Sequence, residues 1–368
     1  ADAAALAAAL AHARGRDETG ATNAAALNEG FSNSNPDDTV SVSIEDVPSG
    51  ECPNTAIGKD ITVQIVSQAR TYFAPVVGVQ QITNTVSATA RSCESYVGPL
   101  FPGNAIVALT PSGTGFDAAG NPEWDITGGG IFSNSSSSTS ARCKGASSIT
   151  APSLTTVGSY DLSCAAHVPD ANSGATQYQF SDYSGLLPDP PDCDGTATKE
   201  GSFWVAEAGK DGSRVAWSGD MQFGPGLFCV SNSPGPFHGQ ISGTGVTFFL
   251  MPDNFSVKFN GGGNMTASAP ASGDYAGVLM FSAPVRSGGV LQETQSIDLR
   301  GNGTADLVGS VIVPSAAVTM FGNSGSSGFH TQVIAYRVDS GGNANININY
   351  QAGEQYPASY PAWLTLLR

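Results

Sequence analysis

The sequence predicts a mainly β protein with a small α+β N-terminal module and a parallel β-helix or β-solenoid-like body, a β-sandwich being the alternative. Only 12% of the residues are charged and 45 are glycine, a composition typical of turn-rich β-proteins. After about residue 100, short β-branched and aromatic runs alternate with Gly, Asn and Ser clusters. These clusters recur about every 20 residues, the interval of one solenoid coil.

The first 15 residues are mostly Ala and Leu, which favour a helix. We expect Ala4, Leu6, Ala8 and Leu10 to form an apolar surface that packs against other copies of the chain, the alternative being a helix docked on its own domain. If the first reading holds, deletion of residues 1–15 leaves a folded protein that does not assemble.

The rest of the N-terminal module, expected over residues 1–96, alternates between strand and turn signals. Residues 39–47 and 60–66 alternate apolar and polar side chains with a period of two, which predicts half-buried strands. A short helix is expected over 67–78 and a third strand over 84–92.

The body is expected over residues 97–368. Runs such as GVTFFL (245–250), GSVIVP (309–314) and TQVIAYRV (331–338) predict its strands. Residues around 165–220 include the Pro/Asp-rich LLPDPPDCDG and are predicted to be an irregular insertion or lateral subdomain on this body.

Six cysteines without a CxxC pair predict three disulfides and an oxidising compartment. Because short loops close most easily, sequential pairing is the expected connectivity among the 15 that six cysteines allow. The six are Cys52, Cys93, Cys143, Cys164, Cys193 and Cys229.

The net charge of −16 argues against nucleic acid and anionic membrane surfaces as partners, since phosphates are bound by cations and the chain has 15 Lys and Arg. No apolar stretch is long enough to span a membrane. The chain begins in mid-helix, so we expect a processed or trimmed form that is extracellular or at the cell surface.

Two acidic clusters are candidate cation sites. Asp189, Asp192 and Asp194 lie in the Pro-rich segment and could bind Ca²⁺, the alternatives being a solvated loop and a catalytic carboxylate cluster. Residues 116–125 (FDAAGNPEWD) resemble a calcium loop only loosely, and a polar turn with Trp124 in the core is the expected structure. We find no nucleophile elbow, phosphate loop or zinc pattern, so we expect no catalytic residues, no enzymatic activity and no cofactor beyond that calcium.

The sequence also contains candidate sugar-stacking aromatic residues and candidate glycan acceptors. Trp204, Trp217 and Tyr183 could stack on sugars in a carbohydrate-binding or carbohydrate-active solenoid, although each is more typical of a core. Asn134, Asn254, Asn264 and Asn302 lie in N-x-S/T triplets and are candidate glycan acceptors in an exported protein.

Two stretches resemble the TadE/TadG-like pilus-assembly proteins. The first comprises DAAALAAA (Asp2 to Ala9), Tyr72–Phe73, the turn from Val76 to Val79 and the strand NTVSATARS. The second comprises GGGIFSNSSSS, GPGLFCV with GTGVTFFL, YAGVLMF and GNGTADLVGSVIVPSAAVTMFGNSG, which resemble the β-rich region of TadG-like members. In that family a membrane helix precedes the segment matching Asp2, and this chain starts just after it.

The resemblance implies a bacterial protein associated with cell-surface filaments, and it provides no catalytic residues. We therefore expect a structural subunit or accessory of an extracellular filament or pilus, assembling with itself through the N-terminal helix or through β-edges, and with other pilus or envelope components as further partners. The alternatives are a monomeric adhesin and the carbohydrate-binding or carbohydrate-active solenoid.

Overall fold

The computed structural model describes residues 1–48, 51–52, 57–71, 80–231, 239–251, 256–257, 264–301, 306–323, 329–340 and 345–367. The chain forms two compact units. Unit 1 comprises Ala1–Val97 together with Ser359–Arg368, and unit 2 comprises Gly98–Ala358. The boundary lies one residue from the expected one. The last ten residues, however, were expected in the body and belong to unit 1, because the final strand pairs with that unit's sheet.

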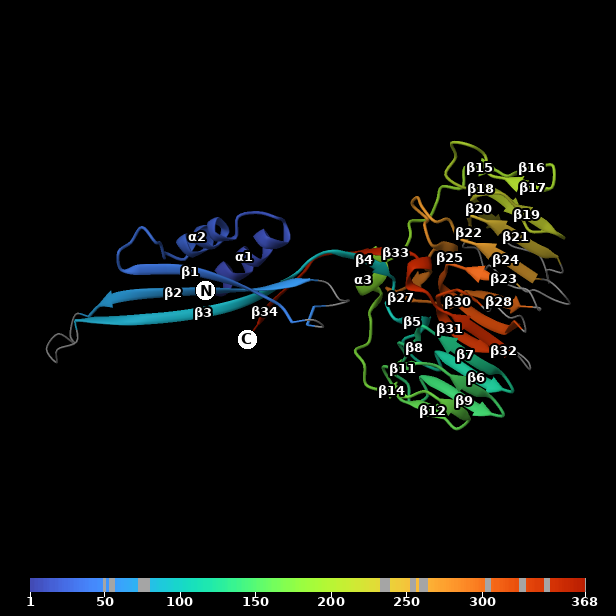
Figure 1. The fold of residues 1–368 in the computed structure, drawn as a ribbon, viewed down its shortest axis with the longest axis horizontal. Helices are drawn as coiled ribbons and strands as arrows, with labels where there is room; N and C mark the ends of the chain where they lie inside the picture. Colours follow the sequence, from blue (N-terminus) through green and yellow to red (C-terminus); the bar gives the residue numbers. More distant parts are fainter. Residues whose placement is uncertain are drawn as a thin grey trace. The chain divides into compact units, whose positions relative to one another are not determined.

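Unit 1 is an antiparallel sheet with two helices packed on it (Figure 1). The strand order is β1-β2-β3-β34. The elements are α1 (Asp2–Ala13), α2 (Glu18–Asn28), β1 (Asp38–Asp46), β2 (Gly58–Arg70), β3 (Gln81–Cys93) and β34 (Trp363–Leu367). The three predicted strands are present. The helix expected over 67–78 is wrong for residues 67–70, which continue β2, and residues 72–79 lie outside the described residues, as do Tyr72–Phe73 and Val76–Val79.

The core of unit 1 is made by small residues on α1 and branched residues on the sheet. Ala5 and Ala8 are fully buried and lie in one apolar cluster with Ile61 and Val63 of β2. Alanine allows the helix backbone to approach the sheet closely, and it also has the highest helix propensity. In the middle of β2, buried side chains alternate with more exposed ones, because successive side chains of a strand point to opposite faces.

The chain passes between the units twice. The crossings lie in β4 (Tyr96–Pro99) and β33 (Pro357–Tyr360), which pair in a two-stranded sheet. Tyr96 stacks on Tyr360 with ring centroids 4.6 Å apart.

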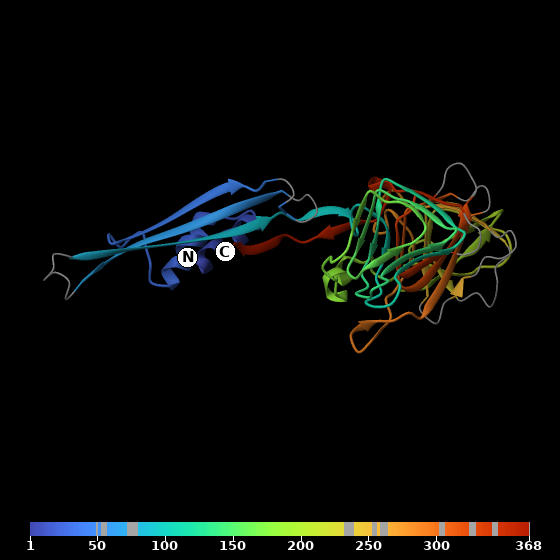
Figure 2. The same cartoon turned by 90° about the horizontal axis from the view of Figure 1, so that it is seen from below.

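Unit 2 is a parallel β-solenoid, which confirms the predicted fold class (Figures 1 and 2). Its first segment comprises β5 (Asn104–Ala108), β6 (Phe116–Gly120), β7 (Glu123–Thr127), β8 (Gly130–Ser133), β9 (Ala141–Gly145), β10 (Ser148–Thr150), β11 (Ser153–Thr156), β12 (Tyr160–Leu162), β13 (Ala165–His167) and β14 (Asp170–Asn172). A connection over 173–194 follows, with α3 (Phe180–Tyr183) and the 3₁₀ helix η3 (Ser184–Leu186).

The second segment continues the solenoid to its end. It comprises β15 (Gly195–Thr196), β16 (Thr198–Glu200), β17 (Phe203–Val205), β18 (Ser213–Ala216), β19 (Met221–Phe223), β20 (Gly226–Ser231), β21 (Gln240–Thr244), β22 (Val246–Leu250), β23 (Ser256–Val257), β24 (Asn264–Ser268), β25 (Val278–Ser282), β26 (Arg286–Ser287), β27 (Val290–Leu291), β28 (Gln295–Gly301), β29 (Leu307–Val308), β30 (Ser310–Asn323), β31 (Val333–Ser340), β32 (Asn345–Asn349) and the 3₁₀ helix η4 (Ala352–Glu354).

One ladder of equivalent positions runs through the stacked coils. Register pairs join successive coils from Leu154 at one end of this ladder to Ser213 near the other. The ladder reads Leu154, Ile131, Ile106, Val333, Val311, Met280, Phe248, Phe228 and Ser213. A coil cannot bury its apolar side chains alone, so each depends on its neighbours for its share of the core.

The order of the coils differs from the order of the sequence. The chain enters the solenoid in the middle, at β5, and builds outward to β14. The 173–194 connection then leads to β15 at the opposite end, and the coils return until β31 pairs with β5 (Figure 1). The last coil therefore stacks on the first. We call this contact of β31 and β32 with β5, β6 and β7 the seam.

The insertion predicted around 165–220 is much smaller than expected. Its beginning forms β13 and β14, and its part from Gly195 onward forms coils of the solenoid. Residues 173–194 lie outside the coils, and β16 pairs antiparallel with β17 instead of stacking in parallel. These coil strands are as short as two or three residues, so their sequence pattern resembles that of a loop.

Candidate functional site

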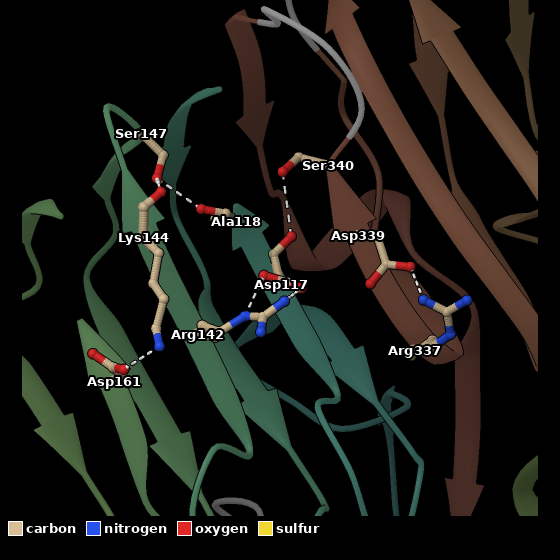
Figure 3. A network of polar contacts seen from close by, with 9 residues as sticks. All are labelled: Asp117, Ala118, Arg142, Lys144, Ser147, Asp161, Arg337, Asp339 and Ser340. Atoms are coloured by element: carbon tan, nitrogen blue, oxygen red, sulfur yellow. Dashed lines mark hydrogen bonds and ion pairs between the residues drawn. The ribbon is translucent and has the colours of Figure 1, made fainter. Parts of the chain in front are cut away.

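Figure 3 shows a network of polar contacts at the seam, formed mainly by side chains of β31, β6, β9 and β12. Asp339, Asp117, Arg142 and Asp161 are successive register partners across the four strands, and we call them the charged row. In the adjacent ladder Val338, Phe116 and Ala141 are buried. Since side chains alternate between the two faces of a strand, the charged row lies on the outer face.

Each carboxylate of the charged row has a cationic partner. The Arg142 guanidinium binds both oxygens of Asp117, with Nε 3.0 Å from Oδ1, and Arg337 contacts Asp339. The Arg337 Nε also lies 3.0 Å from Glu293 Oε2. Bidentate Arg–carboxylate contacts fix geometry as well as charge. The Arg142 contact is of this kind, and the Arg337 contact holds Asp339 on the adjacent strand, about 4.8 Å away in the direction of stacking, where the last coil meets the first.

Burial and charge act in opposite directions on Asp339. Burial raises the pKa of the Asp339 carboxyl, Arg337 lowers it, and the charge of Asp117 raises it again, leaving the pKa above its ordinary value. By contrast, the hydrogen bond from Lys144 lowers the pKa of Asp161. The two ends of the row therefore respond oppositely to pH.

We expect Asp339→Asn to stabilise unit 2 at neutral pH and to have no stabilising effect in acid. A raised native pKa contributes stability below the unfolded-state pKa, and this stability is lost as pH rises through the native pKa. Asparagine removes that loss. Urea unfolding at neutral and acidic pH measures the difference, with Asp161→Asn as a control of opposite sign. An Asp339→Asn variant that is less stable at neutral pH would contradict the dominance of burial over the Arg337 ion pair.

Hydrogen bonds inside the solenoid also close the seam. The buried Gln332 side chain donates from Nε2 to the carbonyl oxygens of Leu100 and Asn104, at 2.6 and 2.8 Å, and these residues lie at the entrance to the first coil. On the neighbouring sheet, the fully buried Trp124 lies between its register partners Ile149 and Ile346. The expected placement of Trp124 in the core is confirmed.

The structure does not bring the predicted calcium ligands together. Asp194 forms an ion pair with Lys210 (Oδ2–Nζ 3.2 Å), and it accepts a hydrogen bond from the backbone N–H of Asp211. The backbone carbonyl oxygen of Asp189 accepts a hydrogen bond from the hydroxyl of Tyr275. Among the residues that the structure describes, no group of three His, Cys, Asp or Glu side chains could hold a metal ion. The second acidic cluster is also divided, since Asp117 pairs with Arg142.

The four predicted helix residues lie on two different faces of α1. Ala4 and Ala8 are 2% and 0% exposed and belong to the core of unit 1. Leu6 and Leu10 are 39% and 38% exposed. The expectation that all four pack against other copies is therefore corrected: spacings of two place them on opposite sides of a helix of 3.6 residues per turn, and only the leucines are available.

The predicted sequential disulfides are confirmed. Cys52 pairs with Cys93, Cys143 with Cys164, and Cys193 with Cys229. The last of these ties the end of the 173–194 connection to β20. Three disulfides indicate folding in an oxidising compartment outside the cytoplasm.

The aromatic and glycan candidates are largely internal. Trp217 and Tyr183 are buried, and the half-buried Trp204 packs against the solenoid core. Asn134 is 2% exposed and exchanges hydrogen bonds with the backbone of Tyr178, so it is not accessible to a glycan. Asn254 and Asn302 lie outside the described residues.

No family model, curated protein or solved structure matches this chain. Its site must therefore be interpreted from its own geometry. In the described part of the chain, no helix is long and apolar enough to cross a membrane.

Neither the charged row nor the seam was predicted from the sequence. The only local signal was the alternation in FDAAG, ARCKG and YRVDS, which places charges on one face of each strand. Nothing local shows that Asp339 pairs with Asp117, because the two residues come from opposite ends of the solenoid's sequence.

Proposed function

We propose that the chain is a structural subunit or accessory of an extracellular filament, in which unit 1 makes the contacts with other copies and unit 2 is the part presented. The charged row has no catalytic role in this proposal, because its three carboxylates are paired with Arg142, Arg337 and Lys144.

The observation that carries the proposal is the distribution of exposed apolar side chains. Of the twelve large hydrophobic residues that are exposed in the described chain, nine belong to unit 1, although this unit holds less than a third of the residues. The nine are Leu6, Leu10, Leu27, Ile44, Ile57, Ile82, Val86, Val97 and Trp363. Exposed apolar surface concentrated in this way is typical of a protein–protein interface.

Within that set, Leu6 and Leu10 are the best candidates for a contact between copies. They are four residues apart on α1, so they lie next to each other on one face of the helix. This face is opposite the alanines that pack on the sheet. The helix is thus already positioned by its own core and presents the leucines outward.

The ends of the solenoid are weaker candidates for assembly. The edge strands β14 and β15 are only three and two residues long, and acidic residues lie at both ends, including Asp170 at one and Asp192 and Asp194 at the other. Short edges and like charges both oppose strand pairing between copies.

We expect Leu6→Asp/Leu10→Asp to abolish self-association while the protein remains folded. Two charges placed in an apolar interface would be desolvated without partners, at a cost of several kcal/mol. Electron microscopy and sedimentation velocity of the non-reduced full chain provide the measurement. Val290→Asp is the matched control, since Val290 is 51% exposed and lies in unit 2.

Two results would overturn the proposal in different ways. A wild-type chain that stays monomeric at near-physiological salt would favour the monomeric adhesin. Filaments of the double aspartate variant that match those of the wild type would remove α1 from the interface and leave the other apolar residues of unit 1 to be tested.

A further inference from the structure

A hollow of about 470 Å³ lies on the outer face of the sheet formed by β17, β19, β21, β24 and β29. We call it the groove. It shares no residue with the charged row. Its volume is within the range of small-ligand sites.

The floor of the groove is a row of side chains in register. Phe203 of β17 pairs with Gln222 of β19, which pairs with Ser242 of β21, which pairs with Thr266 of β24. Asp306 continues the row, because it directly precedes Leu307, the register partner of Ala267. Five coils at a strand spacing of about 4.8 Å give a row about 19 Å long.

A second row of hydroxyl groups runs beside the first. Thr244 pairs with Ser268, and both line the groove. The groove therefore offers hydroxyl and amide groups repeated at the strand spacing, each able to donate and accept hydrogen bonds. An elongated ligand with regularly spaced polar groups could use the same contact in successive coils.

Asp306 provides the strongest indication that the groove binds a ligand with a hydrogen-bond donor. Its Oδ1 is buried and has no hydrogen-bond partner among the residues that the structure describes. A buried carboxylate oxygen without a partner is costly, and a donor from a ligand would satisfy it. At the other end of the row, the Phe203 ring is 42% exposed, although large aromatic side chains are usually well covered.

The charge and topology of the groove narrow the class of ligand. Among the residues described as lining it, Asp306 is the one charged group. With a net charge of −16 the chain repels polyanions. The strands β19, β21 and β24 are paired on both sides, so their backbones cannot accept an added peptide strand. Recognition must come from side chains: an aromatic face, hydroxyls, an amide and one carboxylate.

The geometry points to the groove as a binding site for a neutral, linear carbohydrate that runs across the coils. The apolar face of one sugar ring packs on Phe203, and hydroxyls of further units bond to Gln222, Ser242 and Thr266. The terminal contact is a hydroxyl that donates to Asp306 Oδ1. This activity goes beyond the proposed assembly role and uses unit 2 only.

Isothermal titration calorimetry of the full chain tests the site with neutral hexasaccharides of glucose (β-1,3 and β-1,4), mannose and N-acetylglucosamine, and with hexagalacturonate as the anionic comparison. We expect at least one neutral hexasaccharide to bind and hexagalacturonate not to bind. Phe203→Ala and Asp306→Asn should each weaken binding about tenfold, the effect of losing one stacking contact or one hydrogen bond to a charged group. Val290→Ala should bind like the wild type.

Three outcomes would overturn the assignment. They are no binding of any neutral hexasaccharide, equal binding by both groove variants and the wild type, and tighter binding of hexagalacturonate. Circular dichroism of each variant confirms that it is folded, and Asn is isosteric with Asp. The sugar-binding experiment does not measure assembly. A failure to bind sugar therefore does not bear on the role of Leu6 and Leu10, and a failure to self-associate does not bear on the groove.

Discussion

Replacement of Trp124 with alanine is expected to destabilise unit 2 by about 3–5 kcal/mol. Trp124 is fully buried, its ring centroid lies 5.1 Å from that of Phe116, and its register partners are Ile149 on one side and Ile346 on the other. Truncation leaves a cavity at the seam that neighbouring coils cannot fill, because a stacked coil is held in register by its hydrogen bonds.

We expect the destabilisation caused by Trp124→Ala to be largest at the seam. Chemical denaturation followed by hydrogen exchange at the amides of β7 and β32 measures it, since these strands pair through residues 123–127 and 345–349. Trp124→Phe is the matched control: it keeps an aromatic ring, and within the described part of the chain the Trp124 Nε1 makes no hydrogen bond that would be lost. A loss below about 1 kcal/mol for the alanine variant would contradict the stacking of the last coil on the first.

Replacement of Ala8 with aspartate is expected to unfold unit 1, at a cost of about 3–5 kcal/mol. Ala8 is fully buried between α1 and the sheet, within the same cluster as Ile61 and Ala90. A carboxylate there would be removed from water with no cation beside it. Leu10→Asp, on the exposed face of the same helix, should leave the unit folded.

Thermal unfolding followed by circular dichroism, with limited proteolysis of unit 1, distinguishes the two variants. Deletion of residues 1–15 would remove Ala4, Ala5, Ala8 and Ala9 from the core, so we now expect it to unfold unit 1 rather than to leave a folded protein. A stable, protease-resistant Ala8→Asp protein would show that α1 does not depend on this face.

Several features followed from the sequence alone because they depend on local physics. The strands of unit 1 were recognised from a period of two, and the helix from its alanines. The disulfides join cysteines that are successive in the chain, with separations of 41, 21 and 36 residues, so the preference for short loops was sufficient. The change to short strands near residue 100 placed the boundary close to Val97.

Other features were decided only by the tertiary structure. Every coil of a solenoid carries a similar pattern of apolar and polar residues, so the pattern does not specify which coil stacks on which. The pairing of β31 with β5 therefore could not be predicted from it. The pattern also does not predict that Asp117 lies beside Asp339, or that the residues from Phe203 to Asp306 form one row. Both arrangements depend on which strands stack together. On α1, the sequence determined that the helix is apolar, but only the packing of the sheet decided that its alanines are covered and its leucines exposed, because an apolar helix has no preferred face until a partner surface buries one.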